Sequence, residues 1–139
     1  MTVADISEAA LTATRERLGE RGRRVTWLVA DARQLRLPEQ VDVWHDRAVF
    51  HFLTQEADQA AYLESLRAAL RVGGHVIIAT FGLEGPERCS GLPVERYDAA
   101  RLSRRLGPDF ELVRSLDKKH VTPSGAVQQF TYGVFRRLR

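Results

Sequence analysis

The chain has 139 residues, of which 44% are hydrophobic and 28% are charged, and its formal net charge is +3. This balance is typical of one globular domain with a hydrophobic core and excludes a disordered chain. Cys89 is the only cysteine, which excludes an internal disulfide and a cysteine zinc cluster. No apolar run reaches the ~20 residues of a membrane-spanning helix, and the N-terminus lacks a signal-peptide pattern, so we expect a cytoplasmic protein without a membrane partner.

The basic residues are nearly all arginine, since Lys118 and Lys119 are the only lysines. Such a bias can indicate phosphate binding, and it also arises from a coding sequence rich in G and C. The arginines are scattered among Asp and Glu. No aromatic residues alternate with them, as they would in a protein that binds single-stranded nucleic acid. The pattern therefore argues against nucleic-acid binding.

The first part of the chain alternates strand and helix patterns. Residues 25–30 form a nearly continuous apolar run, rich in β-branched and aromatic side chains, which is typical of a strand buried on both faces. Ser7 is a suitable N-cap residue, and Gly19 and Gly22 are suitable stops for the helix that follows it. The expected elements are a strand over residues 2–4, a helix after Ser7, a strand over residues 25–30 and a strand over residues 41–46.

The second part continues the alternation and then ends in two adjacent strands. The expected elements are a helix from Thr54 to Gly73-Gly74, a strand over residues 75–81, a loop over residues 82–93, a helix from Asp98 to Gly107-Pro108, and strands over residues 110–116 and 128–135 around a turn at 123–125. This order predicts an α/β fold, a doubly wound, mostly parallel sheet with a C-terminal antiparallel hairpin.

Three successive predicted strands end in aspartate, at Asp5, Asp31 and Asp46. Ligands of open parallel sheets bind beyond the carboxyl ends of the strands, so these side chains are expected at one edge. A carboxylate there can accept from a ribose diol, and another can accept from an adenine amino group while the following amide, that of Ala32, donates to a ring nitrogen. The alternative is that such aspartates only cap helices or form turns.

Four segments in this order resemble motifs of class I S-adenosylmethionine-dependent methyltransferases. Residues 3–7 resemble the ribose-binding motif, residues 29–32 the adenine-binding motif, and residues 42–47 the fourth-strand motif. Residues 70–76 resemble the turn between helix and strand, with Val72 in place of the usual proline. The closing hairpin is also characteristic of this family and argues against a dinucleotide dehydrogenase. The resemblance implies a Rossmann-like fold with S-adenosylmethionine as cofactor.

The resemblance also implies roles for individual residues. Asp5 would bind the ribose diol, Ile6 would pack on one face of the adenine, and Asp31 with the Ala32 amide would read the adenine edge. Asp46 would lie near the sulfonium and amino group, where a carboxylate faces positive charge. Methyl transfer in this family is a direct in-line displacement that depends on alignment and needs no dedicated base.

The residues after Asp46 are candidates for the methyl acceptor. Asp46-Arg47 followed by apolar residues resembles the small-molecule, thiopurine methyltransferase-like branch, which implies that Arg47 holds an anionic or polar acceptor. His51 is a candidate general base. Its alternative is a histidine packed on Phe50 and Phe52 and hydrogen-bonded to a loop carbonyl. No spacing of His, Cys, Asp and Glu predicts a metal site.

The first strand and glycine-rich turn of the family have no counterpart here, so residues 1–139 read as a single, incomplete domain truncated at its N-terminus. The missing strand would lie between those at residues 2–4 and 41–46. Either these two pair directly, or another chain in a homodimer or with a partner supplies a strand, or a longer form does. The expected function is methyl transfer to a small-molecule acceptor, which needs that longer form or partner; the alternative is a non-catalytic methyltransferase-like binding or partner-subunit module.

Overall fold

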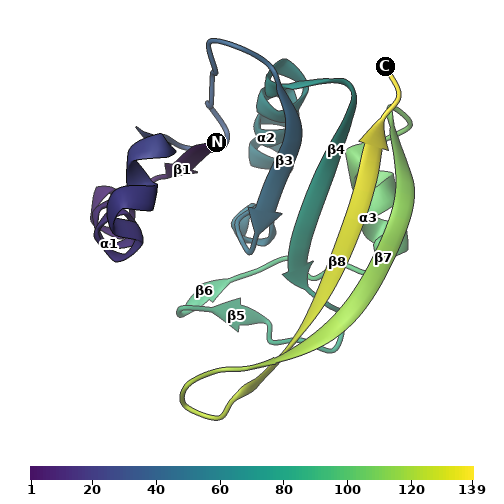
Figure 1. Cartoon of the computed structure of the whole chain (residues 1–139). Helices are drawn as coiled ribbons and strands as arrows, with labels where there is room; N and C mark the ends of the chain where they lie inside the picture. The colour runs from purple at the N-terminus through teal and green to yellow at the C-terminus, as the bar shows by residue number, and fades with distance from the viewer.

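The computed structural model describes residues 1–139 as an α/β structure of helices and strands (Figure 1). Two short 3-10 turns, η1 and η2, complete it. The elements are β1 (Thr2–Asp5), α1 (Glu8–Leu18), η1 (Gly19–Arg24), β2 (Thr26–Val29), β3 (Val41–Arg47), η2 (Phe50–Phe52), α2 (Glu56–Ala69), β4 (Leu70–Phe81), β5 (Arg88–Cys89), β6 (Leu92–Pro93), α3 (Ala99–Leu106), β7 (Phe110–Val121) and β8 (Val127–Arg137).

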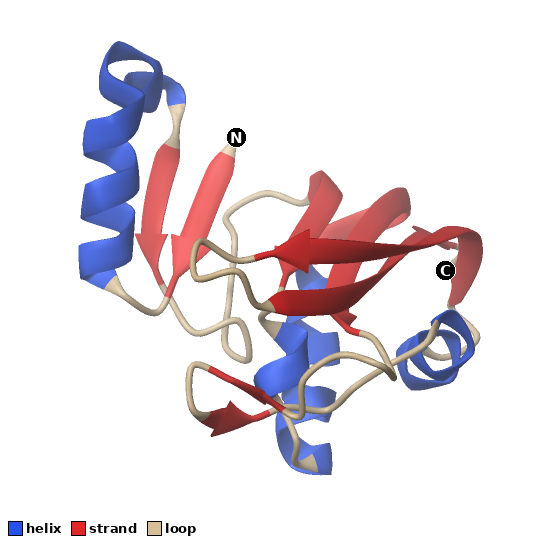
Figure 2. Cartoon of the chain, turned by 90° about the horizontal axis from the view of Figure 1, so that it is seen from below, coloured by secondary structure: helices blue, strands red, loops and turns tan.

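The main sheet has four strands in the order β3-β4-β8-β7. β3 and β4 are parallel, whereas β8 is antiparallel to both of its neighbours. β1 and β2 form a separate parallel pair, and β5 with β6 forms a small hairpin (Figure 2). Parallel strands joined through helices and a closing antiparallel hairpin confirm the predicted architecture.

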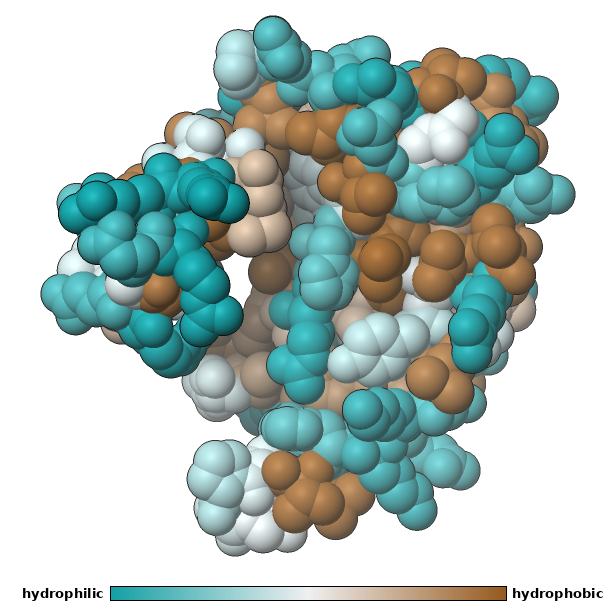
Figure 3. Space-filling model, viewed as in Figure 1, coloured by the Kyte–Doolittle hydropathy of each residue, from teal (hydrophilic) through white to brown (hydrophobic).

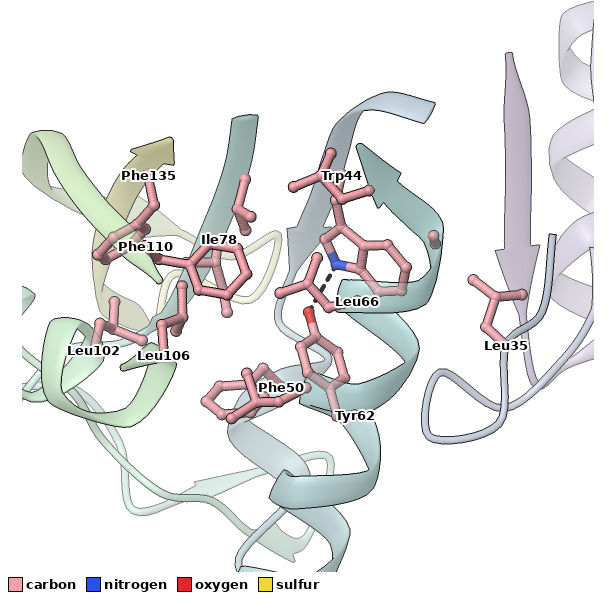
Figure 4. Close-up of a cluster of buried hydrophobic side chains, with 14 of the residues drawn as sticks. Leu35, Trp44, Phe50, Tyr62, Leu66, Ile78, Leu102, Leu106, Phe110 and Phe135 are labelled. Carbon is pink, nitrogen blue, oxygen red and sulfur yellow. Dashed lines mark hydrogen bonds between the residues drawn. The ribbon is translucent and has the colours of Figure 1, made fainter. Parts of the chain in front are cut away.

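The hydrophobic core lies between the main sheet and the helices α2 and α3. Alternate residues of β3 and β4 point to this side, and the buried stripe predicted for α2 packs against them. Trp44 of β3 donates its Nε1–H to the hydroxyl of Tyr62 on α2 at 2.9 Å (Figure 4). The core side chains labelled in Figure 4 are Leu35, Trp44, Phe50, Tyr62, Leu66, Ile78, Leu102, Leu106, Phe110 and Phe135.

The sheet is divided between β1 and β3. β1 pairs only with β2, and β3 pairs only with β4, so of the three alternatives the direct pairing of residues 2–4 with residues 41–46 does not occur. Figure 3 shows an opening between the unit of β1, α1 and β2 and the rest of the molecule. We call this opening between the unpaired edges of β1 and β3 the slot.

Several predicted boundaries also differ from the structure. Gln55, and not Thr54, precedes the first residue of α2, and its side chain makes no capping hydrogen bond. The helix ends at Ala69, because Leu70 is already extended and pairs with Val41; Gly73-Gly74 therefore lies inside β4. The caps at Ser7 and Asp98 are confirmed, since each side chain accepts a backbone amide of the first turn.

Strand β2 is shorter and more exposed than predicted. Its pattern favoured burial on both faces, yet Val29 is 59% exposed. β2 pairs only with β1, and α1 and the contact of Leu28 with the main core are its other packing, so it lacks the second strand neighbour that a central strand has. The hairpin strands β7 and β8 are longer than predicted, because their antiparallel pairing continues to the turn, where Gly125 has a φ of 86°.

Candidate functional site

The carboxyl ends of β1 and β2 lie side by side. The parallel register pairs Asp5 with Val29, so Asp5 and Asp31 emerge at the same edge. The Oδ1 atom of Asp5 accepts the Ser7 amide at 2.8 Å, which shapes the turn into α1. The next residue, Ile6, exposes 71% of its surface. An exposed apolar side chain can pack on a flat ring, and the carboxylate beside it can accept hydrogen bonds from hydroxyls attached to that ring.

The Asp31 carboxylate is held by an arginine two residues later. Arg33 donates from Nε to both oxygens of Asp31, and from Nη2 to Oδ2 at 2.6 Å. Its Nη1 reaches Asp58 of α2 at 2.8 Å. These side-chain hydrogen bonds from Arg33 lower the pKa of Asp31, so this carboxyl is ionised at neutral pH. Arg33 thus links the end of β2 to α2 and occupies both oxygens expected to read an adenine.

The Ala32 amide remains a free donor at this edge. No hydrogen bond within the chain uses it, while the preceding carboxylate accepts the Arg33 amide. The Ala32 side chain is partly buried against the main core, which fixes the turn. We call Asp5, Ile6, Asp31 and Ala32 the adenosine edge.

Asp46 lies on the helix side of β3 and is 5% exposed. Its Oδ1 accepts the Val49 amide at 2.9 Å, and its Oδ2 accepts the Phe50 amide at 3.0 Å and the Tyr62 hydroxyl at 2.6 Å. Burial raises the pKa of this carboxyl, and the three donors partly offset that effect. Through these contacts Asp46 fixes the turn η2. Its partners are protein donors, whereas the family resemblance implied that it lies near the amino group of the cofactor.

Arg47 follows Asp46 and lies on the opposite side of the sheet. Its Nε donates to the Tyr132 hydroxyl at 3.1 Å, and its guanidinium carbon lies 4.7 Å from the centre of the Phe130 ring. The guanidinium is exposed and has no carboxylate within ion-pair distance. Arg47 is therefore available to a polar or anionic group at the carboxyl end of β3.

His51 is fully buried between aromatic rings. Its ring packs edge-on against Phe52 and Phe81, with centroids 4.7 Å away in each case. Nδ1 accepts the Phe81 amide at 3.0 Å, so the proton of the neutral ring is on Nε2, which has no hydrogen-bond partner. Burial lowers the pKa of His51 to about 4. The packing agrees with the alternative of a structural histidine, with a backbone amide in place of the expected carbonyl.

The backbone between these side chains is strained. Ala48 has a φ of 64°, a conformation that is rare outside glycine, and its amide donates to the Ala79 carbonyl at 2.9 Å. The pleat of β3 sends Asp46 to the core and Arg47 to the open side, and the turn at Ala48 follows directly. Such strain collects at functional sites. No sequence pattern signals this position, because alanine has no preference for that conformation.

Comparison with known proteins identifies the family. Residues 1–74 match the sequence profile of a family described as a methyltransferase domain, which is more than half of the chain. The chain therefore belongs to this family of methyltransferase domains. No curated protein matches the chain.

Solved structures share the fold of the whole chain. One, from a study of the conversion of a disulfide bond into a thioacetal group during echinomycin biosynthesis, has a TM-score of 0.78 and 21% identity over 99% of this chain and 66% of that one. The N-methyltransferase NodS from Bradyrhizobium japonicum WM9 has a TM-score of 0.78 and 16% identity, with 99% and 73% covered. The 1,6-didemethyltoxoflavin-N1-methyltransferase from Burkholderia thailandensis has a TM-score of 0.71 and 21% identity, with 99% and 61% covered.

The fold is thus the Rossmann-like methyltransferase fold, and the chain spans about two thirds of the length of these structures. No helix of the structure is both long and apolar enough to cross a membrane. The structure also contains no group of three or more His, Cys, Asp and Glu side chains arranged to hold a metal ion.

Proposed function

We propose that the protein transfers a methyl group from S-adenosylmethionine to a small-molecule acceptor, with the adenosine edge as its cofactor site. The observation that carries this proposal is the register of β1 with β2, which gathers Asp5, Ile6, Asp31 and Ala32 at one edge. Family membership supports the reaction type, and NodS and the didemethyltoxoflavin enzyme, both N-methyltransferases by name, have the same fold.

The residues present fit the adenosine part of the cofactor. One oxygen of Asp5 is engaged by Ser7, which leaves the other for a ribose hydroxyl. Ile6 offers an apolar face for the ring, and the free Ala32 amide offers a donor for a ring nitrogen. Asp31 would contribute an oxygen lone pair beside Arg33. When bound, the cofactor supplies an electrophilic methyl group.

The acceptor would lie near Arg47, at the carboxyl end of β3. Its exposed guanidinium would hold a polar or anionic acceptor, in the manner of the thiopurine methyltransferase-like branch, and the Phe130 and Tyr132 contacts would fix its orientation. Holding acceptor and methyl group in line and excluding water is the chief contribution of such a site. The transfer needs no dedicated base, and the buried His51 would serve by holding η2 against the end of β4 through the Phe81 amide.

Activity would require a further strand in the slot. The facing edges of β1 and β3 are unpaired, although β1 carries half of the adenosine edge and β3 leads to Arg47. A strand between them, from a longer form of the protein, a second copy or a partner chain, would join the two parts into one sheet and fix their distance. Residues 1–139 would then form one domain that is incomplete by itself.

Titration of the chain with S-adenosylmethionine in a calorimeter tests the cofactor site. Asp5→Ala should weaken binding by about 1–3 kcal/mol, because a charge-assisted hydrogen bond is lost. Asp5→Asn keeps an oxygen that can accept the Ser7 amide. Comparing it with Asp5→Ala therefore separates the effect of the lost charge from the effect of a changed turn. Asp42→Ala, at the amino end of β3, is a control that should leave the affinity unchanged. An Asp5→Ala variant with wild-type affinity would refute the placement of the ribose.

A non-catalytic methyltransferase-like module is the second candidate. The engagement of both Asp31 oxygens by Arg33 and of Asp46 by three protein donors favours it. The same titration separates the two candidates. Absence of cofactor binding by the chain, alone and in any complex that fills the slot, would favour the module.

A further inference from the structure

A basic cavity lies beside helix α3. Its volume is about 370 Å³, which is within the range of roughly 300–1,000 Å³ that is usual for small-molecule sites. The lining consists of three arginines, one glutamate and one tyrosine, so two positive charges remain uncompensated. No residue of the adenosine edge takes part. The lining residues are Glu95, Tyr97, Arg101, Arg104 and Arg105.

The helical repeat gathers the arginines on one flank of α3. Arg101 lies next to both of the others, because Arg104 follows it by three residues and Arg105 by four. Leu102 and Leu106 occupy the opposite flank and point into the core (Figure 4). The packing of these two leucines therefore fixes the helix in an orientation that presents the arginines to the cavity.

Tyr97 forms the buried wall of the cavity and is 3% exposed. Its hydroxyl accepts the Nε2–H of Gln59, on α2, at 3.3 Å. The hydroxyl hydrogen has no acceptor within the chain, and the nearby Oε1 atom of Gln59 is buried without a partner. A buried donor that lacks an acceptor is unfavourable. A ligand in the cavity would supply the acceptor that the chain does not.

This hydroxyl is a donor at neutral pH. Burial raises the pKa of Tyr97 to about 12, and the charge of Glu95 acts in the same direction, whereas Arg105 and Arg101 oppose it. The two guanidinium groups are thus close enough to the hydroxyl to contact the same bound group.

Two of the three arginines have no carboxylate partner. Arg104 and Arg105 take part in none of the ion pairs of the chain, and Arg101 reaches Glu95 only at 3.9 Å. Attraction to the helix dipole explains cations in the last turn of a helix. It does not explain why they line a cavity together with a buried hydroxyl donor.

We propose that this cavity binds a doubly charged phosphate group, either free or as the monoester of a small molecule. Such a group carries about −1.5 to −2 charges at pH 7 and has three strong acceptor oxygens. These properties match the two uncompensated charges and the donors of Arg104, Arg105 and Tyr97. A carboxylate brings one charge and two oxygens, and a nucleic-acid phosphodiester brings one charge, so either would leave part of the lining uncompensated.

This site is independent of methyl transfer. The double variant Arg104→Gln with Arg105→Gln should bind S-adenosylmethionine as the wild type does, because neither residue belongs to the adenosine edge. Loss of phosphate binding with cofactor binding retained would concern the cavity alone, and the reverse result would concern the adenosine edge alone.

Calorimetric titrations with methyl phosphate and dimethyl phosphate provide the test. At about pH 7.5 the first is mainly a dianion, because its second pKa is near 6, and the second is a monoanion. Methyl phosphate should bind about tenfold or more tightly. Inorganic phosphate and ribose 5-phosphate distinguish the two sources of the group. Tighter binding of ribose 5-phosphate indicates an ester as the ligand, and equal or tighter binding of inorganic phosphate indicates free phosphate.

Charge-neutral substitutions locate the contact. Arg104→Gln with Arg105→Gln should weaken binding of methyl phosphate about tenfold or more. Glu95→Gln removes the one carboxylate of the lining and should tighten binding about threefold or more. The control is Arg114→Gln with Arg136→Gln, which removes two arginines from the sheet face opposite to α3 and should leave the affinity near that of the wild type.

Tyr97→Phe tests the buried donor separately. Gln59 keeps the Leu53 carbonyl as an acceptor for its Nε2–H at 2.7 Å, so this variant should fold, which circular dichroism checks. Its affinity for methyl phosphate should fall about threefold or more. Equal affinity of the wild type for methyl and dimethyl phosphate, equal losses in the two double variants, or no binding of any of these phosphates would overturn the proposal.

Discussion

At the scale of single residues, buried polar groups determine what each candidate side chain can do. Asp46 was expected near the sulfonium, and His51 was a candidate base with a structural alternative; both side chains are enclosed by protein. Their backbone partners explain why: Val49, Phe50 and Phe81 each donate an amide to one of these two side chains. Asp46 thus holds the start of η2, and His51 ties η2 to the end of β4.

The lowered pKa of His51 predicts how stability depends on pH. The unfolded chain takes up a proton on this ring near pH 6.5, whereas the folded protein does so only near pH 4. His51 therefore favours folding above about pH 6.5, and this contribution is lost as the pH falls towards 4. His51→Asn keeps an acceptor for the Phe81 amide and does not titrate. The stability difference between wild type and variant in urea melts should shrink across this window.

The pKa of Asp46 is also shifted by folding, but Asp46 is present in both the wild type and His51→Asn. Its raised pKa acts in the opposite direction, because the folded state binds the proton more readily than the unfolded state. That contribution cancels in the difference between wild type and His51→Asn. A difference that stays constant from pH 7 to about 4 would mean that the ring takes up its proton equally readily in the folded and the unfolded protein, as a ring that reaches solvent does.

At the scale of elements, one hydroxyl joins β3 to α2. The Tyr62 hydroxyl accepts from Trp44 and donates to Asp46, so it connects a strand, a helix and the turn η2. Tyr62→Phe should cost about 1–3 kcal/mol of unfolding free energy, because the Trp44 N–H and a buried carboxylate each lose a partner.

Tyr132→Phe is the matched control, since that hydroxyl accepts only from the exposed Arg47. Its cost should remain below about 1 kcal/mol. Chemical denaturation monitored by tryptophan fluorescence measures both variants, because Trp44 is in the core. Equal losses would show that the Tyr62 network adds no stability beyond that of an exposed hydrogen bond.

The elements also show what a sequence can and cannot predict. Ser7, Asp98 and the hairpin turn at Gly125 were predictable, because caps and turns depend on residues that are near in sequence. The end of α2 at Ala69 was not, since Leu70 is extended through its pairing with Val41.

The same holds for the candidate site: its local features could be predicted from the sequence, and its long-range contacts could not. The order of Asp5, Ile6, Asp31 and Ala32 along the chain was enough to place them at one edge. The hydrogen bonds of Arg33 to Asp58, 25 residues later, and of Tyr62 to Asp46, 16 residues earlier, depend on tertiary structure, which neighbouring residues in the sequence do not signal.

At the scale of the whole molecule, the division of the sheet predicts unequal local stability. β1 has four residues, pairs on one side only and packs against a helix whose one buried side chain is Leu11. β4 and β8 pair on both sides and carry much of the core. In hydrogen exchange followed by mass spectrometry, β1, α1 and β2 should exchange much faster than β4 and β8.

A ligand or strand that fills the slot should slow exchange in β1 and β2 and leave β4 nearly unchanged. Uniform protection of both parts in the free chain would contradict the prediction. It would mean that the contacts of Arg33 and of Leu35 with the helix side already bind the two parts into one cooperative unit.

The unpaired strand edges at the slot and at β7 differ in how well they resist aggregation. The outer edge of β7 is guarded by a bulge between Leu112 and Arg114 and by Lys118 and Lys119, devices that prevent strands of different molecules from adding to a sheet. β1 has no charged residue before Asp5, and β3 has no lysine. In a concentrated solution, intermolecular strand addition is therefore expected at the slot before the outer edge of β7, and a segment that fills the slot would also protect the chain from aggregation.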